Sequence, residues 1–395
     1  MLRRKFNTEK ANTASVKHNT GFVLDNFLEA EVKPALMPLY VAQWLTLAPK
    51  YSLRYDFITS NGHKFNTIVS LCAVVIAAAW FYNILEHLSN FVRINAITIF
   101  TYSAILGIAL ICNSFVTVSY SNMNAYFIIL IQRIQKRFVF LNFDNRSIAK
   151  ANWMFLIIMA MYNIAHFTTR MFEESSGVVR IVLTHIICLS CDCNSIIAIR
   201  TIHLLGKLVD TWISELKTFS YANCDDTEAN NYMNKIIVGY DELIHGINIC
   251  NKVFRVPVFF TVLSTFFHVF VNVQAAISFT YLINKYFLIP KVPVWTKSMY
   301  VAQFIWVKNI TLLAFLSKES ESIHLKVKNA QVASVVLCAR GTTTEMSRLV
   351  HRQRRAVSGR WLRAAGIFPV NAALPPSLLA VLATYTVVLL QFHFL

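Results

Sequence analysis

The tightest cluster of residue types that can do chemistry is CLSCDC, at residues 188–193. Thiolates and carboxylates bind zinc, so three cysteines beside an aspartate suggest a metal site. On a helix, however, Cys188 and Cys191 share one face while Cys193 turns away, and no histidine is suitably close in the sequence. We therefore expect the cysteines to be reduced packing residues, and we expect no metal and no cofactor.

Asp192 stands inside an apolar segment, where an ionisable side chain is a candidate for function. Lys308 stands deep within a later apolar segment and is a possible partner. The alternative is that Asp192 faces a loop or reaches the interface, because its segment could begin further along the chain.

Enzyme motifs are absent from the sequence. The eleven histidines form no His-x-x-x-His or His-x-x-His-His box of the membrane di-iron enzymes. The chain also has no Gly-rich phosphate loop and no Gly-x-Ser-x-Gly nucleophile motif. We therefore expect that the protein is not an enzyme.

The composition indicates a membrane protein. Of the 395 residues, 56% are hydrophobic and only 14% are charged, and the mean hydropathy is +0.49. Soluble domains carry roughly a quarter charged residues. The net charge of +17 is then better explained by basic cytosolic loops than by nucleic-acid binding, and we expect no nucleic-acid partner.

Bilayer-crossing helices need about 20 apolar residues. Seven segments qualify, at about 65–85, 94–119, 151–171, 178–200, 256–284, 294–316 and 372–393. The stretch at 34–49 is too short and is interrupted by prolines, so we expect an interfacial or re-entrant helix. The amphipathic stretch at 127–141 is expected to be a cytosolic extension. The polar, basic N-terminus has no apolar signal-peptide core, so insertion is expected to depend on the internal spans.

Basic residues predict the orientation. With a cytosolic N-terminus, 30 of the 37 Lys and Arg residues lie inside and six outside, as the positive-inside rule requires. The C-terminus is then extracellular. A G-protein-coupled receptor has an extracellular N-terminus, and its Asp-Arg-Tyr and Asn-Pro-x-x-Tyr motifs are missing here.

The last apolar segment carries a sharp pattern. Thr384-Tyr385, then five residues of which four are hydrophobic, then Gln391-Phe392 follow the stretch AGIFPVN at 365–371. This pattern resembles the C-terminal signature of insect gustatory receptors. The stretch PLYVAQWLTLAP also resembles the weaker N-terminal pattern of that family, although Leu47-Ala48 stands where Gly-Leu is usual. The resemblance is sharp over about thirty residues and diffuse elsewhere.

The resemblance implies a ligand-gated, non-selective cation channel of four subunits, each of which contributes its last helix to a central pore. The assembly is either a homotetramer or a heterotetramer with related subunits, and the implied location is the plasma membrane of chemosensory neurons. Gln391 and Phe392 would lie near the outer mouth, ~28–30 Å along the helix from Ala372, where Phe392 closes the pore by dewetting. Thr384 and Tyr385 would lie near mid-membrane. The implied pore and gate residues are Thr384, Tyr385, Val388, Gln391 and Phe392. The alternative is that these residues only pack helices together.

A small tastant would bind among polar and aromatic side chains in the outer halves of the spans, because such side chains are costly in contact with lipid. The candidates are Tyr162, His166, Asn272, Gln274, Tyr281, Gln303 and Trp306. For any single one of them, helix packing is the alternative role.

Four regions are expected. Residues 1–64 form a cytosolic segment with a short interfacial helix, and 65–316 form spans one to six with cytosolic helical extensions at 119–150 and 201–255. Residues 317–371 form a cytosolic assembly region, and 372–395 form the pore helix.

A basic cluster lies just before the pore helix. Arg352, Arg354 and Arg355, with Trp361 at the interface, are candidates to bind anionic membrane lipids; a solvated basic face is the alternative. The other functions considered are an odorant-receptor-like channel subunit, a G-protein-coupled receptor and a transporter.

Overall fold

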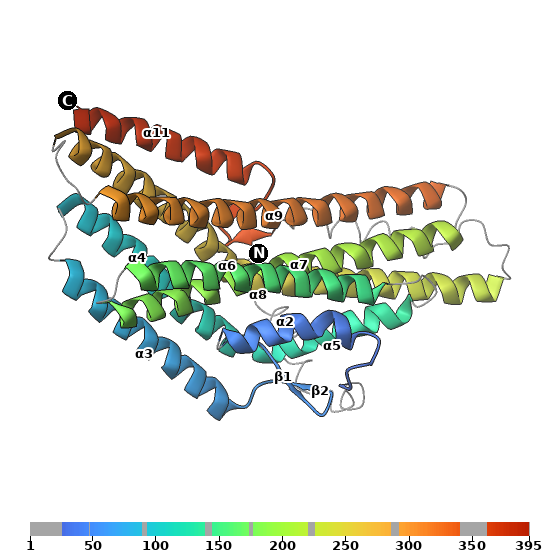
Figure 1. The fold of residues 1–395 in the computed structure, drawn as a ribbon. Helices are drawn as coiled ribbons and strands as arrows, with labels where there is room; N and C mark the ends of the chain where they lie inside the picture. Colours follow the sequence, from blue (N-terminus) through green and yellow to red (C-terminus); the bar gives the residue numbers. More distant parts are fainter. Residues whose placement is uncertain are drawn as a thin grey trace, which may run out of the picture.

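The computed structural model describes residues 26–46, 48–88, 93–138, 144–173, 177–219, 226–285, 292–339 and 362–394. This part of the chain is almost entirely helical (Figure 1). The long helices are α3 (His63–Leu88), α4 (Arg93–Ser119), α6 (Asn145–Glu173), α7 (Val178–Phe219), α8 (Asp226–Lys285), α9 (Val292–Ala339) and α11 (Leu374–Phe394). The shorter helices are α2 (Lys33–Leu45) and α5 (Ser121–Arg137).

Each of the seven apolar segments expected to cross a membrane lies in one long helix. Among the described residues, six helices are long and apolar enough to cross a bilayer, namely α3, α4, α6, α7, α8 and α11. The segment expected at 294–316 lies in α9, where the side chains of 292–304 lie outside the described residues.

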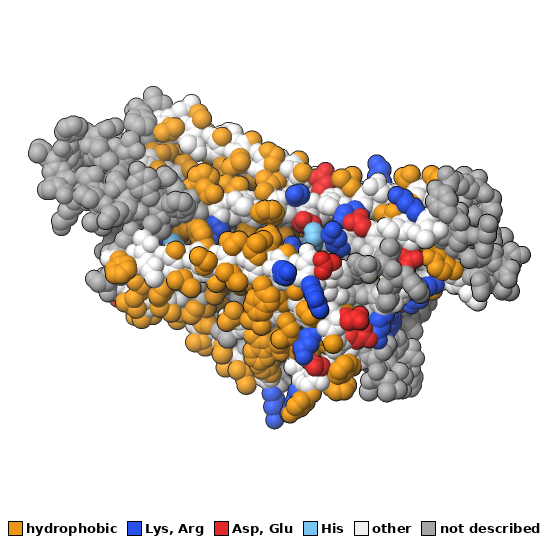
Figure 2. Space-filling model, turned by 45° about the vertical axis from the view of Figure 1, so that its right-hand side comes forward, with side chains coloured by type: hydrophobic (Ala, Val, Ile, Leu, Met, Phe, Trp, Pro, Cys, Tyr) orange, Lys and Arg blue, Asp and Glu red, His pale blue; other side chains and the backbone are white. Residues whose placement is uncertain are grey.

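Three helices are much longer than a membrane is thick. α7, α8 and α9 have 42, 60 and 48 residues, or roughly 60–90 Å at 1.5 Å per residue, against a hydrocarbon core of about 30 Å. Their far ends run side by side beyond the rest of the bundle (Figure 1). Figure 2 shows hydrophobic side chains over one part of the visible face and charged side chains gathered over the other. The three helices therefore continue without a break from the apolar part of the molecule into the charged part.

The largest apolar core among the described residues reaches from the expected spans into this extended part. It joins buried side chains of α2, α5, α7 and α8, including the fully buried Trp212. The Trp212 indole donates a hydrogen bond to the carbonyl of Ile236, 3.0 Å away. Arg137 of α5 donates two hydrogen bonds of 3.1 Å to the carboxylate of Glu242 on α8. The amphipathic stretch that we expected outside the spans is therefore a separate helix docked on α8.

The short helix α2 covers the expected proline-bounded stretch and packs mainly on α6. The side-chain amide of Asn152 on α6 donates to the carbonyl of Ala35, 2.7 Å away. A hairpin follows, in which β1 (Ser52–Arg54) pairs antiparallel with β2 (Phe57–Thr59). This hairpin was not anticipated from the sequence.

A second hairpin lies just before the last helix. β3 (Arg363–Ala364) pairs with β4 (Phe368–Pro369), and its turn places Ala365 and Gly366 at φ 49° and 81°. Glycine adopts such positive φ values at little cost. The backbone N–H of Ala365 donates to the carbonyl of Arg255 on α8, 2.8 Å away. The start of α11 is thereby positioned against the bundle.

Candidate functional site

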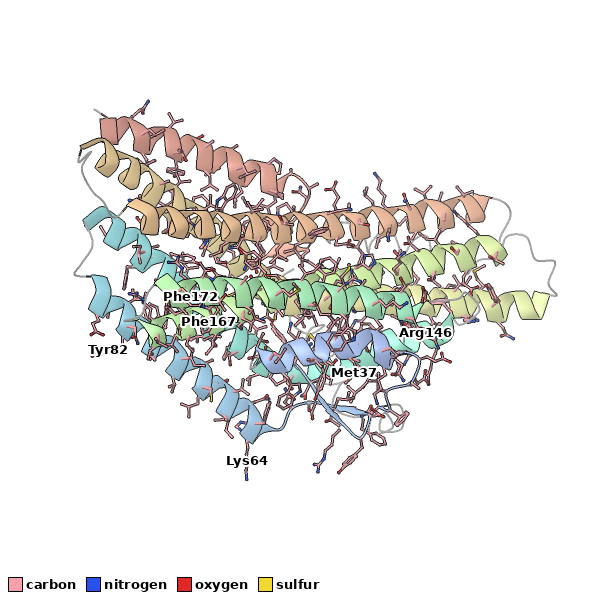
Figure 3. All side chains as sticks on the ribbon, in the orientation of Figure 1. Met37, Lys64, Tyr82, Arg146, Phe167 and Phe172 are labelled. Atoms are coloured by element: carbon pink, nitrogen blue, oxygen red, sulfur yellow. The ribbon has the colours of Figure 1, made fainter. Side chains whose placement is uncertain are left out.

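A cavity of about 420 Å³ lies between six helices, α3, α4, α6, α7, α8 and α9. Its residues come from the halves of these helices nearest to the connections 89–92, 174–176 and 286–291, the side expected to be extracellular. Figure 3 marks this end of α6 by Phe167 and Phe172, and the opposite end by Arg146. The size and the position between helices suit a small molecule.

The walls of the cavity differ in character. α3 and α4 contribute mostly apolar side chains, among them Trp80, Ile84 and Leu106. The Trp80 indole donates to the carbonyl of Ser103, 3.3 Å away, which fixes α3 against α4. α6, α7 and α8 contribute most of the polar side chains. A ligand in the cavity therefore meets an apolar wall on one side and hydrogen-bonding groups on the other.

Two of the predicted pocket residues, Tyr162 and His166, line this cavity. They lie four residues apart on α6 and therefore share one face of the helix. The ammonium of Lys308 lies 5.3 Å from the centre of the Tyr162 ring. Their role in binding remains a prediction.

His166 belongs to a hydrogen-bonded pair. Its Nδ1 lies 2.7 Å from Nε2 of His185, and Nδ1 of His185 lies 2.7 Å from the carbonyl oxygen of Ile181. A carbonyl only accepts, so His185 must carry a proton on Nδ1. His268 of α8 forms a similar contact, with its Nδ1 2.9 Å from the Tyr102 hydroxyl. His185, His268 and Tyr102 were not predicted, because polar residues on four helices cannot be aligned from one sequence.

Asp192 and Lys308 form an ion pair in the cavity wall. Oδ2 of Asp192 lies 2.5 Å from Nζ of Lys308, and the two side chains are 9% and 12% exposed. Each charge would be costly alone in such surroundings, and the pair satisfies both. The partnership suggested by the sequence is confirmed, and Asp192 does not face a loop.

Other predicted pocket residues lie elsewhere. Asn272 donates its amide to the carbonyl of His268, 2.8 Å away on the same helix, and Gln274 is buried but does not line the cavity. Trp306 packs in an apolar cluster with residues of α8 and α11. The side chains of Tyr281 and Gln303 lie outside the described residues. The structure therefore brings Tyr162 and His166 together and leaves the described others apart from them.

The last helix, α11, is mostly exposed. Among its described side chains only Leu378 and Leu382 are buried, where the helix packs on α8 and α9. Of the expected pore residues, Thr384, Tyr385, Val388 and Gln391 are exposed, and the side chain of Phe392 lies outside the described residues. The Tyr385 ring contacts Phe270 edge-on, with 6.3 Å between the ring centres. Contacts within this chain therefore cover part of the Tyr385 side chain but leave most of the surface of α11 uncovered.

Cys188 and Cys191 line the cavity as free thiols, and Cys193 is buried beside them. In the part of the chain that the structure describes, no group of three or more His, Cys, Asp or Glu side chains can hold a metal ion. The basic cluster expected to meet lipid, Arg352, Arg354 and Arg355, lies outside the described residues together with Trp361.

Comparisons with known proteins connect this fold to solved structures. No protein-family model matches the chain, and no curated protein sequence matches it. The structure is similar to the insect olfactory receptor OR5 from Machilis hrabei in complex with eugenol, with a TM-score of 0.58 and 11% identity, covering 91% of this chain and 98% of that chain. A second structure of OR5 gives a TM-score of 0.55 and 13% identity, covering 90% of this chain and 97% of that one. The chain therefore has the fold of an insect olfactory receptor, and the all-helical, seven-helix membrane fold predicted from the sequence is confirmed.

Proposed function

We propose that this chain is an insect chemosensory receptor that acts as a ligand-gated, non-selective cation channel. A small molecule in the cavity between α3, α4, α6, α7, α8 and α9 opens the channel. The observation that carries the proposal is this half-open cavity of about 420 Å³ between six helices, in a chain with the fold of a receptor solved with eugenol. A ligand shifts the closed–open equilibrium only by its differential affinity for the two states.

The channel part of the proposal is supported by α11. An apolar helix that its own chain leaves largely uncovered needs lipid or other subunits around it. Four copies around a common axis turn each position of its exposed face into a ring. Gln391 and Phe392 then form the outer ring pair, with Phe392 as the hydrophobic gate. The subunits are copies of this chain or related receptor subunits.

The orientation belongs to the same proposal. A cytosolic N-terminus and an extracellular C-terminus, in the plasma membrane of chemosensory neurons, put the cavity on the outside of the cell. The extended ends of α7, α8 and α9 then lie in the cytosol. Tastants reach the cavity from outside.

Between the two channel readings, we propose a gustatory receptor, because Thr384, Tyr385, Gln391 and Phe392 match the gustatory signature. An odorant-receptor-like subunit is the second candidate, since the chain shares the fold of the olfactory receptor OR5. A tastant panel and a panel of volatile odorants, applied to the same cells, separate the two.

The test is expression of the chain, alone and with related subunits, in cells where G-protein signalling is blocked. Ligand-evoked cation current that survives the block is the expected result. A response that disappears with the block identifies a coupled receptor instead. A C-terminal tag should be labelled on unpermeabilised cells, and a tag reached only after permeabilisation would overturn the orientation.

A further inference from the structure

Two ion pairs and one histidine–carboxylate hydrogen bond join α7 to α9 in one continuous row. Asp192 pairs with Lys308 at 2.5 Å, His203 Nδ1 with Glu319 at 3.1 Å, and Asp210 with Lys326 at 2.7 Å. In each pair the partners are 116 positions apart in the chain. The two helices therefore run parallel, with one register kept over the whole row.

The spacing explains why all three contacts form. From the first to the third contact each helix advances 18 residues, which is five turns at 3.6 residues per turn. The residues that form the contacts consequently fall on a single stripe of each helix. Sliding one helix by one turn, about 5.4 Å, would break all three contacts together. Gly206 lies near the third contact, where an added Cβ would come within 3.3 Å of the Lys326 ammonium.

The row extends from the cavity into the extended part of the bundle. Asp192 and Lys308 line the cavity, whereas the side chains of Asp210 and Lys326 are 44% and 24% exposed. The distance along the axis is roughly 27 Å. α7 and α9 thus connect the candidate ligand site with the part of the protein that we expect to be cytosolic.

α9 also holds the base of the last helix. Glu321 follows the second contact by two residues, and its Oε2 accepts a hydrogen bond from the backbone N–H of Ala372, 2.7 Å away. Ala372 lies two residues before α11 begins. Among the described side chains, Glu321 is the one that hydrogen-bonds the backbone just before α11. It lies on α9, the same helix that carries Lys308.

We propose that α7 and α9 form one rigid strut, locked in register by these three contacts, and that Glu321 is the positioning residue that links the strut to the pore helix α11. Ligand-driven movement at Lys308 is carried along α9 and reaches α11 through Ala372. The inference rests on the proposed channel function. It assigns to Glu321 a role in gating that is separate from ligand binding.

The first experiment removes the link. The probes are sucrose, quinine and eugenol, and the compound with the largest wild-type current is used throughout. Glu321→Ala should lower the maximal evoked current about fivefold or more, while the rise in unfolding temperature that the compound gives to purified protein stays unchanged. Glu321→Gln keeps an oxygen acceptor for the Ala372 N–H and should restore the current to within about twofold. Asn329→Ala, at an exposed position of the same helix, is the matched control and should behave as wild type.

The second experiment tests the strut at its far end. Asp210→Lys should shift the half-maximal concentration of the same compound about fivefold or more, although it lies roughly 27 Å from Asp192 along the helix. Combining it with Lys326→Asp exchanges the charges and should restore the wild-type value.

Three results would each overturn the strut. Glu321→Ala could pass normal current, the Ala and Gln variants of Glu321 could show equal defects, or Asp210→Lys could leave the half-maximal concentration unchanged. If none of the three compounds evokes wild-type current, the strut is judged by unfolding alone. Asp210→Lys must then lower the unfolding temperature and the exchanged pair must recover it; failure to recover overturns the inference.

Discussion

Asp192 on α7 and Lys308 on α9 meet in the wall of the candidate ligand cavity, with 2.5 Å between carboxylate and ammonium. The Lys308 ammonium also lies 5.3 Å from the centre of the Tyr162 ring. The pair therefore joins three helices, α6, α7 and α9, at one point. A ligand that moves any of these side chains disturbs a buried electrostatic contact, which gives the cavity a means to act on the helices around it.

Removing one partner of this pair should destabilise the protein strongly. Asp192→Leu or Lys308→Met leaves a buried charge without its counter-ion, at a cost of about 3–5 kcal/mol in the free energy of unfolding. The double variant should recover most of the loss, because no unpaired charge remains. The measurement is the free energy of unfolding in detergent, for each single variant and for the double variant. A double variant as unstable as the sum of the singles would mean that the two charges do not interact.

His166→Ala should weaken the response to an activating compound by about tenfold, since loss of a good polar contact costs about 1.4 kcal/mol. Asn272→Ala is the matched control, because Asn272 bonds only its own helix among the described contacts. Concentration–response curves, corrected for surface expression, provide the measurement. Equal shifts in both variants would place the binding site elsewhere.

Lys50 should make the stability of the protein depend on pH. It lies between α2 and β1, outside the expected spans, and its ammonium lies 3.9 Å from the centre of the Phe254 ring. Its Nζ is buried without a hydrogen-bond partner among the described residues. Burial lowers the pKa of Lys50 to about 7, whereas an unfolded chain keeps it near 10.4.

Between these two pKa values the unfolded chain binds a proton that the folded chain does not. The free energy of unfolding should therefore rise with pH above about 7, by at most about 1.4 kcal/mol per pH unit from this group. Lys50→Met should remove that rise and stabilise the protein at pH 7 and below. Lys64→Met, at an exposed position, serves as the control. A pH profile in Lys50→Met that parallels the wild type would rule out this role.

Phe392→Ala should open the gate in the absence of ligand. Removing a ring of aromatic side chains widens and wets the outer mouth, and a change of about 1 kcal/mol in the closed–open equilibrium raises the unliganded current roughly fivefold. Val387→Ala alters an exposed apolar position on the same helix and is the control. Single-channel recordings decide the matter, and unchanged unliganded and evoked currents in Phe392→Ala would show that this residue only packs.

The helices were predictable because their signal is local. Seven apolar segments of sufficient length each lie in one long helix, and Pro375-Pro376 fall in the first turn of α11, where a missing N–H costs nothing. The site was less predictable because it combines six helices. Asp192 and Lys308 could be suspected, since charges are rare in apolar segments. His185, His268 and Tyr102 could not, because which face of each helix turns inward depends on packing that one sequence does not reveal.

The sequence did not predict that α7, α8 and α9 continue unbroken beyond the membrane, because the apolar pattern that marks each span stops where the polar extension begins. The constant separation of 116 residues is visible only when both helices are placed side by side. The two hairpins escaped prediction because β1 and β2 have three residues each and β3 and β4 two each.

The central claim is that this chain is itself a ligand-gated cation channel. The most direct measurement reconstitutes the purified protein, alone or with a related subunit, into planar bilayers that contain no G protein, and records current during application of sucrose, quinine and eugenol. The account predicts discrete cation-selective openings that at least one compound evokes and that Phe392→Ala alters. A purified protein that binds these compounds, as judged by its unfolding temperature, yet passes no current under any of them would contradict the claim.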